Sequence, residues 1–192
     1  MSGLFPDEIL SAPPAIPGLN YLRDYLSERD EQNLVAAVDA EPWDETWDRR
    51  RQPYGVSYGR RKGKELPIPV WGVVLIDRLH REGVGDWRFD QMLVNEYATG
   101  QGISFHRDYD PFDRTVVSLS LLAPCVMEFR RVSDGLRESM LLEPRSLLIL
   151  EDEARYEWEH GIARRKSDHW AGAVIPRRRR LSVTFRMLKQ RS

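Results

Sequence analysis

The chain has 192 residues, of which 41% are hydrophobic and 31% charged, and its formal net charge is −1. This length suits one domain with a sizeable core, and the single cysteine, Cys125, excludes an internal disulfide and fits a reducing compartment. The sequence has no window of about 18 apolar residues, so it predicts no transmembrane helix.

The near-zero net charge conceals two oppositely charged parts. Residues 1–48 carry 11 acidic and 2 basic side chains, whereas residues 49–192 carry 19 acidic and 27 basic ones. The basic residues cluster at 49–64, 163–166 and 177–180, and the first cluster is interleaved with tyrosine and glycine. Such clusters suit a polyanion with stackable bases, although a solvated surface explains the charges alone equally well.

The N-terminal residues predict an irregular arm at 1–17, ahead of a single domain at 18–192. Four of the twelve prolines lie in this arm. It lacks a basic start followed by a long apolar run, so we expect no secretory signal and a cytoplasmic protein. The run 27–40 then predicts a helix, because Ser27 can cap it and its apolar residues form one stripe.

Residues 41–69 are rich in Pro, Gly, Trp, Tyr and Arg, and they predict a long surface segment of the kind that often carries binding. The run 70–83 predicts a second helix that ends at Gly83.

Short β-type runs, separated by glycine, proline or acidic clusters, predominate after the second helix. They are residues 90–98, 115–123, 125–132, 137–143, 146–151, 155–160 and 181–188. A helical N-terminal part followed by about seven strands predicts the α+β class, with helices packed outside a sandwich or barrel.

The stretch "GISFHRDYDPF" at 102–112 places His106 and Asp108 two residues apart. On or just past a strand, this spacing puts both side chains on one face. A third ligand is needed, and His160, at the end of the strand-like run 155–160, is the natural candidate. Two histidines and one carboxylate are typical of non-haem iron(II) oxygenases, although zinc also takes these ligands and the pattern arises often by chance.

The C-terminal strand alternates between an apolar face and a polar face that carries Arg180, Ser182, Thr184 and Arg186. In a barrel wall the two guanidinium groups require an anion, and a dicarboxylate suits them. The alternative is an edge strand whose arginines face water. Asn95 and Tyr97 likewise share one face of the run 90–98 and can hydrogen-bond a carboxylate, unless the tyrosine merely fills the core.

Four motifs together resemble the AlkB family of iron(II)- and 2-oxoglutarate-dependent dioxygenases. They are "NEYATGQGISFHRD", "VVSLSLLAPCVMEF", "RSLLILEDEARYEWEHGI" and "RRLSVTFR", in the family's order and spacing, and the resemblance covers roughly residues 18–189. The text around His160 looks most like the branch that includes the oxygenase domain of tRNA wobble-uridine hydroxylases.

The resemblance implies a double-stranded β-helix (jelly-roll) core with outer N-terminal helices, and it implies Fe(II), 2-oxoglutarate and O2 as cofactors. Carried over residue by residue, it makes His106, Asp108 and His160 the iron ligands. It pairs Arg180, helped by Tyr97, with the distal carboxylate of 2-oxoglutarate. It assigns Arg186 and Asn95 to the end of 2-oxoglutarate that chelates iron.

For the substrate, the resemblance places Asp110 where relatives touch the target base. It places Trp47 and Tyr54 at base-stacking positions of a nucleotide-recognition lid at 41–69. We expect Arg49, Arg50 and Arg51 in this lid to face a phosphate backbone. Ser182 stands where some members have Asn, and Arg177, Arg178 and Arg179 meet either phosphate or only water.

The implied activity is oxidative demethylation of N-alkylated bases, coupled to decarboxylation of 2-oxoglutarate. The expected partner is methylated DNA or RNA, either single-stranded or with the target base flipped out. We expect the protein to be a monomer and to bind no membrane. A tRNA-modifying or protein hydroxylase would use the same iron site. A nucleic-acid-binding β-barrel without chemistry is a third possibility, against which the complete triad and both arginines argue.

Overall fold

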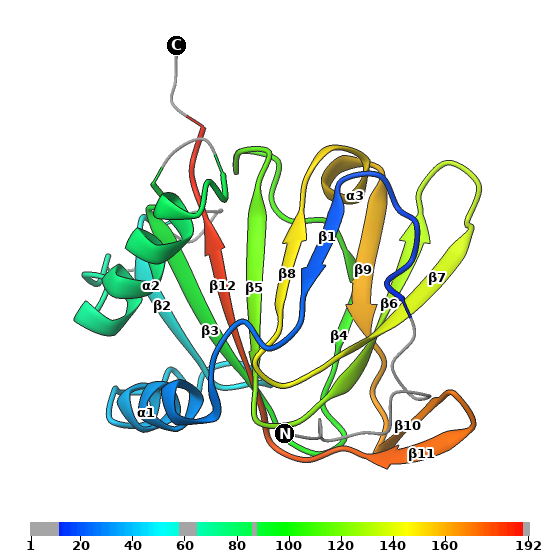
Figure 1. Ribbon diagram of the computed structural model, residues 1–192, viewed down its shortest axis with the longest axis horizontal. Coiled ribbons are helices and arrows are strands. Elements are labelled where there is room, and N and C mark those ends of the chain that lie inside the picture. Colours follow the sequence, from blue (N-terminus) through cyan, green and yellow to red (C-terminus); the bar gives the residue numbers. More distant parts are fainter. Residues whose placement is uncertain (1–11, 58–64, 86–87, 190–192) are drawn as a thin grey trace.

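A six-stranded antiparallel sheet forms the centre of the computed structural model, which describes residues 12–57, 65–85 and 88–189. In spatial order its strands are β1 (Leu19–Leu22), β8 (Leu147–Leu150), β5 (Val116–Leu121), β12 (Arg180–Arg186), β3 (Gln91–Tyr97) and β2 (Arg51–Gly55). A four-stranded sheet of β4 (Ile103–His106), β9 (Trp158–Ile162), β6 (Cys125–Arg131) and β7 (Arg137–Leu142) faces it (Figure 1). β10 (Ser167–Trp170) and β11 (Ala173–Pro176) form a separate hairpin.

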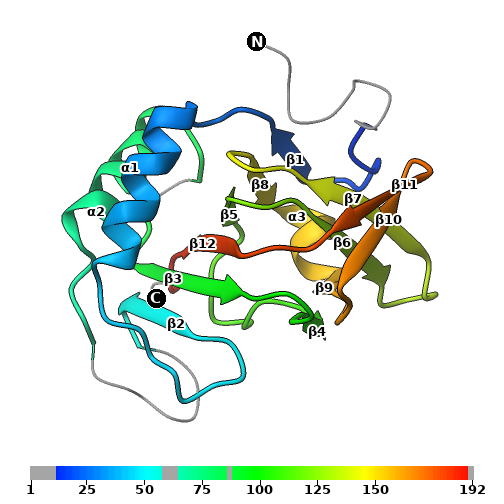
Figure 2. The same ribbon diagram turned by 90° about the horizontal axis from the view of Figure 1, so that it is seen from below.

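Both faces of the large sheet are covered. Between the sheets, side chains of β6 and β7 pack against Leu148 and Leu150 of β8. On the outer face, α1 (Glu28–Asp39) and α2 (Val70–Arg81) lie over the sheet, and Leu34, Val38 and Leu79 join its core (Figure 2). The predicted α+β class with outer N-terminal helices is therefore confirmed.

The helices begin and end at the local signals that the sequence carries. The Ser27 side chain accepts a hydrogen bond from the Asp30 amide at the start of α1. α2 is followed by Gly83, whose φ of +73° lies in the left-handed region that favours glycine. Among the described residues, none of the helices has the length and apolarity needed to cross a membrane.

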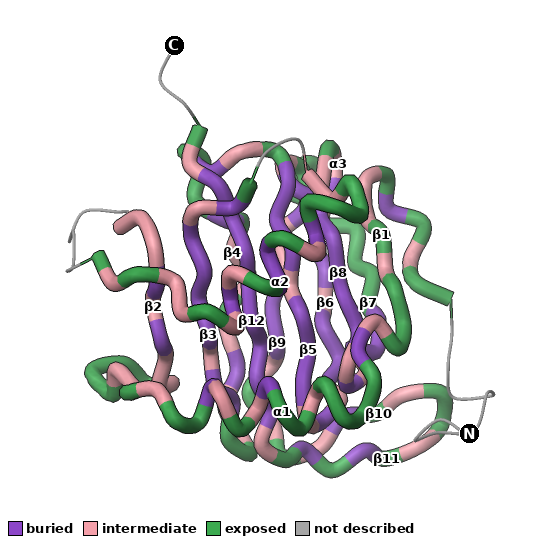
Figure 3. The backbone as a smooth tube through the Cα atoms, turned by 60° about the vertical axis from the view of Figure 1, so that its left-hand side comes forward, coloured by how far each residue is buried: buried purple, intermediate pink, exposed green. Residues whose placement is uncertain are grey.

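β12 is a central strand, hydrogen-bonded to β5 on one side and to β3 on the other. Every residue of β12 is buried (Figure 3), so the edge-strand alternative is wrong. Leu181, Val183 and Phe185 join the core beneath the helices. The polar residues of the strand alternate with them and therefore face the second sheet.

The structure differs from the expected elements in three places. The run 155–160 is not one strand: α3 (Asp152–Tyr156) precedes β9, and acidic residues in its first turn favour a helix start. The segment 41–69 contains β2, which pairs with β3 along the sheet edge. The hairpin strands β10, which contains His169, and β11 were not among the expected strands.

The arm at 1–17 lies mostly outside the described residues. At its described end, Ile16 is buried and packs with the core between the sheets. The last residues of the arm are therefore held against the domain.

Candidate active site

A pocket opens between the two sheets, and its walls carry most of the predicted site residues. The large sheet contributes residues of β3, β5, β8 and β12, and the small sheet contributes residues of β4, β6 and β9. The lining consists of Asn95, Tyr97, Ile103, His106, Asp108, Val116, Ser118, Met127, Leu148, Leu150, His160, Ser182, Thr184 and Arg186. Strand alternation explains this set, because each polar face of β3 and β12 points into the space between the sheets.

His106 and His160 lie opposite each other on the paired strands β4 and β9. Their ring centroids are 4.6 Å apart. His106 Nδ1 lies 2.9 Å from the Ser104 carbonyl oxygen, which can only accept a hydrogen bond. This nitrogen therefore donates, and in the neutral ring Nε2 keeps a free lone pair, as a metal ligand requires.

Asp108 directly follows this strand pair and is buried beside both imidazoles. Its Oδ2 lies 3.6 Å from His160 Nε2, and its Oδ1 accepts a hydrogen bond of 2.6 Å from Arg186 Nε. Burial by itself raises the pKa of Asp108, but Arg186 and then the two histidines outweigh it and hold the pKa well below its usual range. Burial, opposed by Asp108, lowers the pKa of His160 to about 4.

These protonation states fit metal binding, which needs a carboxylate and neutral imidazoles. The donor atoms are not yet gathered around one point, however. In the described part of the chain, no group of three His, Cys, Asp or Glu side chains has the arrangement of a metal site. Arg186 engages one carboxylate oxygen of Asp108, and the other oxygen is the one nearer His160.

Arg180 lies deeper in the large sheet and is only 2% exposed. Its Nη2 donates to Ser120 Oγ at 2.8 Å, whereas Nε and Nη1 are buried without a hydrogen-bond partner. Its guanidinium stands 5.3 Å from the centre of the Tyr97 ring. Tyr97 also lines the pocket at the histidines, and Arg180 lines a smaller cavity next to it. A buried cation with unpartnered donors is costly, so this geometry suits a bound carboxylate.

The remaining cosubstrate candidates also lie at this pocket. Asn95 and Arg186 are on its wall. Ser182 Oγ shares a hydrogen bond of 2.9 Å with Ser118 Oγ, and both serines line the same wall. Ser118 and Ser120 are not among the residues predicted from the sequence, because single serines inside an apolar strand carry no distinct signal before their neighbours are known.

The predicted substrate residues are not brought into this lining. Tyr54 is buried on the opposite face of β2, where it packs edge-on against Trp71 with ring centroids 6.3 Å apart. Trp47 is 61% exposed, and the Arg51 guanidinium stacks on its ring. Asp110 is exposed in the loop after β4. Tyr54 therefore has no path to a bound base in this structure, whereas Trp47 and Asp110 remain accessible.

The arginines of the segment 49–51 are mostly engaged by the protein itself, and residues 58–64 of the basic cluster lie outside the described residues. Arg50 pairs with Glu96, and Arg51 pairs with Asp44 at 3.0 Å. Arg49 donates to the Gly102 carbonyl and stands over the Tyr97 ring. The expectation that all three face a phosphate backbone is not supported by these contacts.

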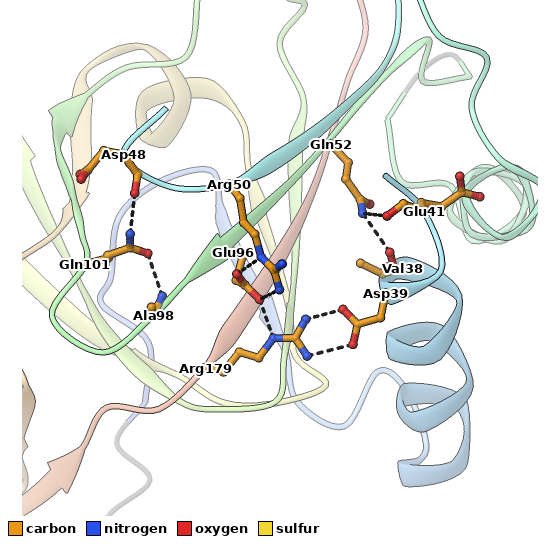
Figure 4. Close-up of polar contacts among 10 residues, drawn as sticks. All are labelled: Val38, Asp39, Glu41, Asp48, Arg50, Gln52, Glu96, Ala98, Gln101 and Arg179. Carbon is orange, nitrogen blue, oxygen red and sulfur yellow. Dashed lines mark hydrogen bonds and ion pairs between the residues drawn. The ribbon is translucent and has the colours of Figure 1, made fainter. Parts of the chain in front are cut away.

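The run Arg177–Arg180 is likewise mostly engaged by other residues of the protein. Arg177 is buried and forms a fork with Asp168, at 2.8 Å from each nitrogen. Arg179 bridges Asp39 of α1 and Glu96 of β3, next to Arg50 (Figure 4). Arg178 is exposed. Two of the three arginines whose role was open thus hold carboxylates rather than phosphate or water.

Comparison with known proteins places this geometry in context. The family model described as the 2OG-Fe(II) oxygenase superfamily matches residues 29–186. The "Alkylated DNA repair protein ALKBH8 homolog" of Arabidopsis thaliana is 35% identical, over 96% of this chain and 62% of that protein. The "tRNA (carboxymethyluridine(34)-5-O)-methyltransferase ALKBH8" of Macaca fascicularis is 33% identical, over 93% of this chain and 32% of that protein. The chain thus spans under two thirds of the length of these two relatives.

Among solved structures, that of OsALKBH1 superposes with a TM-score of 0.69 at 19% identity, covering 89% of this chain and 98% of that one. At this identity the likeness shows the fold alone, and it confirms the predicted jelly-roll core.

Proposed function

We propose that this chain, which belongs to the 2OG-Fe(II) oxygenase superfamily as an AlkB homologue, oxidatively demethylates N-alkylated bases in DNA or RNA. The family uses Fe(II), 2-oxoglutarate and O2, so the chain is an Fe(II)- and 2-oxoglutarate-dependent dioxygenase. The demethylation itself, coupled to decarboxylation of 2-oxoglutarate, is the proposal. The observation that carries it is the pairing of a two-histidine, one-carboxylate cluster with a buried, partly unpartnered Arg180.

In this proposal His106, Asp108 and His160 hold the iron, which supplies the oxidising chemistry together with O2. Asp108 is available as a carboxylate, and His160 as a neutral imidazole, at neutral pH. Arg186 orients the Asp108 side chain through its 2.6 Å hydrogen bond. The two sheets enclose the pocket and limit the access of water to the reacting atoms.

The cosubstrate lies along the inner face of the large sheet. Arg180 and Tyr97 receive its distal carboxylate, and Arg186 and Asn95 receive the end near the iron. Two donors of Arg180 are free of other hydrogen bonds, so they need no rearrangement before they bind the carboxylate. The order of these residues along β3 and β12 supports one orientation of 2-oxoglutarate, because Arg180 and Arg186 are at opposite ends of β12.

The substrate approaches from the edge at β2, with the segment 41–69 as its lid. Arg51 is the register partner of Asn95, so it shares the pocket-side face of the sheet, and it stacks on the exposed Trp47. An exposed aromatic ring beside a cation suits a base taken from a single strand or flipped out of a duplex. The names of the two relatives, which refer to DNA repair and to a tRNA nucleoside, support a nucleic-acid substrate.

A second candidate is hydroxylation of a modified wobble uridine in tRNA at the same iron site. The similarity to the Macaca protein, whose name refers to uridine 34, favours it. The two candidates differ in product: demethylation releases formaldehyde and leaves the unmodified base, whereas hydroxylation leaves one added oxygen atom on the nucleoside.

One assay separates them. The chain is incubated with Fe(II) and 2-oxoglutarate and with methylated DNA and RNA oligonucleotides or tRNA, and succinate, formaldehyde and nucleoside masses are measured. We expect formaldehyde in proportion to succinate with methylated oligonucleotides, and no turnover by Asp108→Ala. Oxygen added to a tRNA uridine without formaldehyde would replace the demethylase proposal by the second candidate. Succinate without any change in nucleic acid would mean uncoupled decarboxylation of 2-oxoglutarate, and it would contradict both candidates for the nucleic acids tested.

A further inference from the structure

Arg155 is a buried cation that is held by backbone carbonyl groups. It belongs to α3 and is 2% exposed. Its Nη1 donates to the Asp108 carbonyl oxygen at 3.1 Å, and its Nη2 donates to the carbonyl oxygens of Tyr109 at 3.0 Å and Phe112 at 3.4 Å. No ion pair joins Arg155 to a carboxylate among the described residues.

Burying the charged guanidinium of Arg155 costs free energy that burying an apolar side chain would not cost. Burial lowers the pKa of Arg155, with the nearby Asp108 carboxylate as the largest opposing influence. Its Nε is also buried without a hydrogen-bond partner. Filling the same space with an apolar side chain avoids the desolvation of a charge. The guanidinium does something that an apolar side chain cannot, because its planar fork binds several carbonyl groups at fixed angles.

The three carbonyl groups belong to the loop that follows β4 and carries both Asp108 and Asp110. Asp108 is therefore held twice: Arg186 binds its carboxylate from the large sheet, and Arg155 binds its backbone from α3. A second link runs in the other direction, since Arg107 donates to the Tyr156 carbonyl oxygen at 2.7 Å.

α3 also leads directly into β9, the strand of His160, at one end of the sandwich (Figure 1). The segment that binds the Asp108 loop thus also carries the second imidazole. The contacts of Arg155 therefore connect the backbone of one candidate ligand to the segment that directly precedes the strand of another.

We infer that Arg155 is a positioning residue, which holds the loop 107–112 so that the Asp108 carboxylate faces His106 and His160. The inference rests on the proposed metal site and adds a residue that touches neither metal nor substrate. Residues that orient metal ligands from behind typically contribute about 10- to 100-fold to metal affinity. Arg155 should also restrain the backbone of the loop whether or not metal is bound.

The test compares Arg155→Lys with the parent chain. Lysine keeps the buried charge, but its single nitrogen cannot bind the three carbonyl groups at the angles that the fork allows. We expect Co(II), measured by its absorption spectrum and by calorimetry, to bind about 10- to 100-fold more weakly. Hydrogen–deuterium exchange without metal should be faster at the amides of 107–112, and unchanged in β5 and β12.

Arg145→Lys is the matched control. Arg145 lies before β8, whereas Arg155 lies beyond the other end of this strand. The largely buried guanidinium of Arg145 pairs with Asp24 and Glu31. This variant should leave both Co(II) affinity and exchange of the loop unchanged. Equal Co(II) affinity and loop exchange in Arg155→Lys and the parent would overturn the inference, and failure of Arg155→Lys to fold would make Arg155 a residue of stability alone.

Different results would contradict the proposed function and the proposed role of Arg155. If the parent chain binds no Co(II), or if His106→Ala binds it equally well, the metal site is wrong. The exchange measurement still decides whether Arg155 restrains the loop, because it is made without metal.

Discussion

At the scale of single residues, the candidate site depends on buried arginines that have different partners. Arg177 meets a carboxylate, Arg155 meets carbonyl groups, and Arg180 keeps two unpartnered nitrogens. The desolvation of a guanidinium is offset only when its donors are used. Arg180 is thus the arginine whose surroundings most require an anion that the protein itself does not provide.

Replacing Arg180 by lysine tests this requirement. Lysine keeps the charge but loses the planar set of donors, so we expect at least one charge-assisted hydrogen bond to 2-oxoglutarate to be lost. Such a bond contributes about 1.5–3 kcal/mol, which corresponds to roughly 10- to 100-fold in the dissociation constant. Calorimetric titration of 2-oxoglutarate in the presence of Mn(II) measures it. An unchanged dissociation constant would show that the distal carboxylate binds elsewhere.

At the scale of elements, an ion-pair network joins α1, β3 and the segments that precede β2 and β12. Glu96 of β3 accepts from both Arg50 and Arg179, and Arg179 continues to Asp39 at the end of α1 (Figure 4). The Gln52 side chain adds a further link, since it donates to the carbonyl oxygens of Val38 and Glu41. The base of the proposed lid is therefore fastened to the sheet and to α1, rather than being free to reach a phosphate backbone.

Glu96→Gln should weaken this fastening and change its pH dependence. Burial alone raises the pKa of Glu96, but hydrogen bonds from Arg50 and Arg179 outweigh it, so the pKa lies below its ordinary value of 4.5. Because the pKa is lowered in the folded chain, ionised Glu96 stabilises the fold at pH values above 4.5. This stabilisation is lost as the pH falls through the folded-state pKa of Glu96. We expect Glu96→Gln to lower the free energy of unfolding by about 1–2 kcal/mol at pH 7. The loss stays this small because the two arginines are partly exposed and solvent screens their charges.

Urea unfolding of the parent and of Glu96→Gln between pH 7 and pH 3 checks this expectation. The difference in the free energy of unfolding should be constant down to about pH 5 and should shrink as the pH falls below 4.5. Glu138→Gln, on the exposed part of β7, is the control and should show little difference at any pH. A difference that persisted undiminished at pH 3 would assign the loss to packing rather than to charge.

At the scale of the whole molecule, the candidate site joins the two sheets. The two histidines belong to the small sheet, whereas Arg180, Arg186, Asn95 and Tyr97 belong to the large one. Metal and cosubstrate bound between them would contact both sheets at once. Ligands that bind only the folded chain stabilise it by mass action, so the site is linked to the stability of the entire domain.

Mn(II) and 2-oxoglutarate together should therefore raise the thermal unfolding midpoint. At a free ligand concentration near 100 times the dissociation constant, the gain is about 2.7 kcal/mol, or roughly 5–10 °C for a chain of this size. Differential scanning fluorimetry measures the shift, with Asp108→Ala as the variant expected to lose it. A shift of equal size in Asp108→Ala would mean that the ligands bind away from the pocket.

The sequence alone determined those features that depend on neighbours along the chain. The cap at Ser27 and the turn at Gly83 are local, and the structure confirms both. The alternation of β12 depends on a period of two, which places Arg180 and Arg186 on one face of any strand they form. The four motifs together were sufficient to recognise the family, and the ligand roles of His106 and His160 stay a prediction.

Only the tertiary structure decided which partners the charged and aromatic side chains have. Arg179 reaches Asp39 across 140 residues of sequence, and Arg155 reaches the Asp108 carbonyl across 47. Tyr54 lies under the helices rather than at the pocket, because the edge pairing of β2 with β3 turns it to that face. Local patterns report which residues share a face, whereas the choice of partner depends on strand order and packing between segments far apart in the chain.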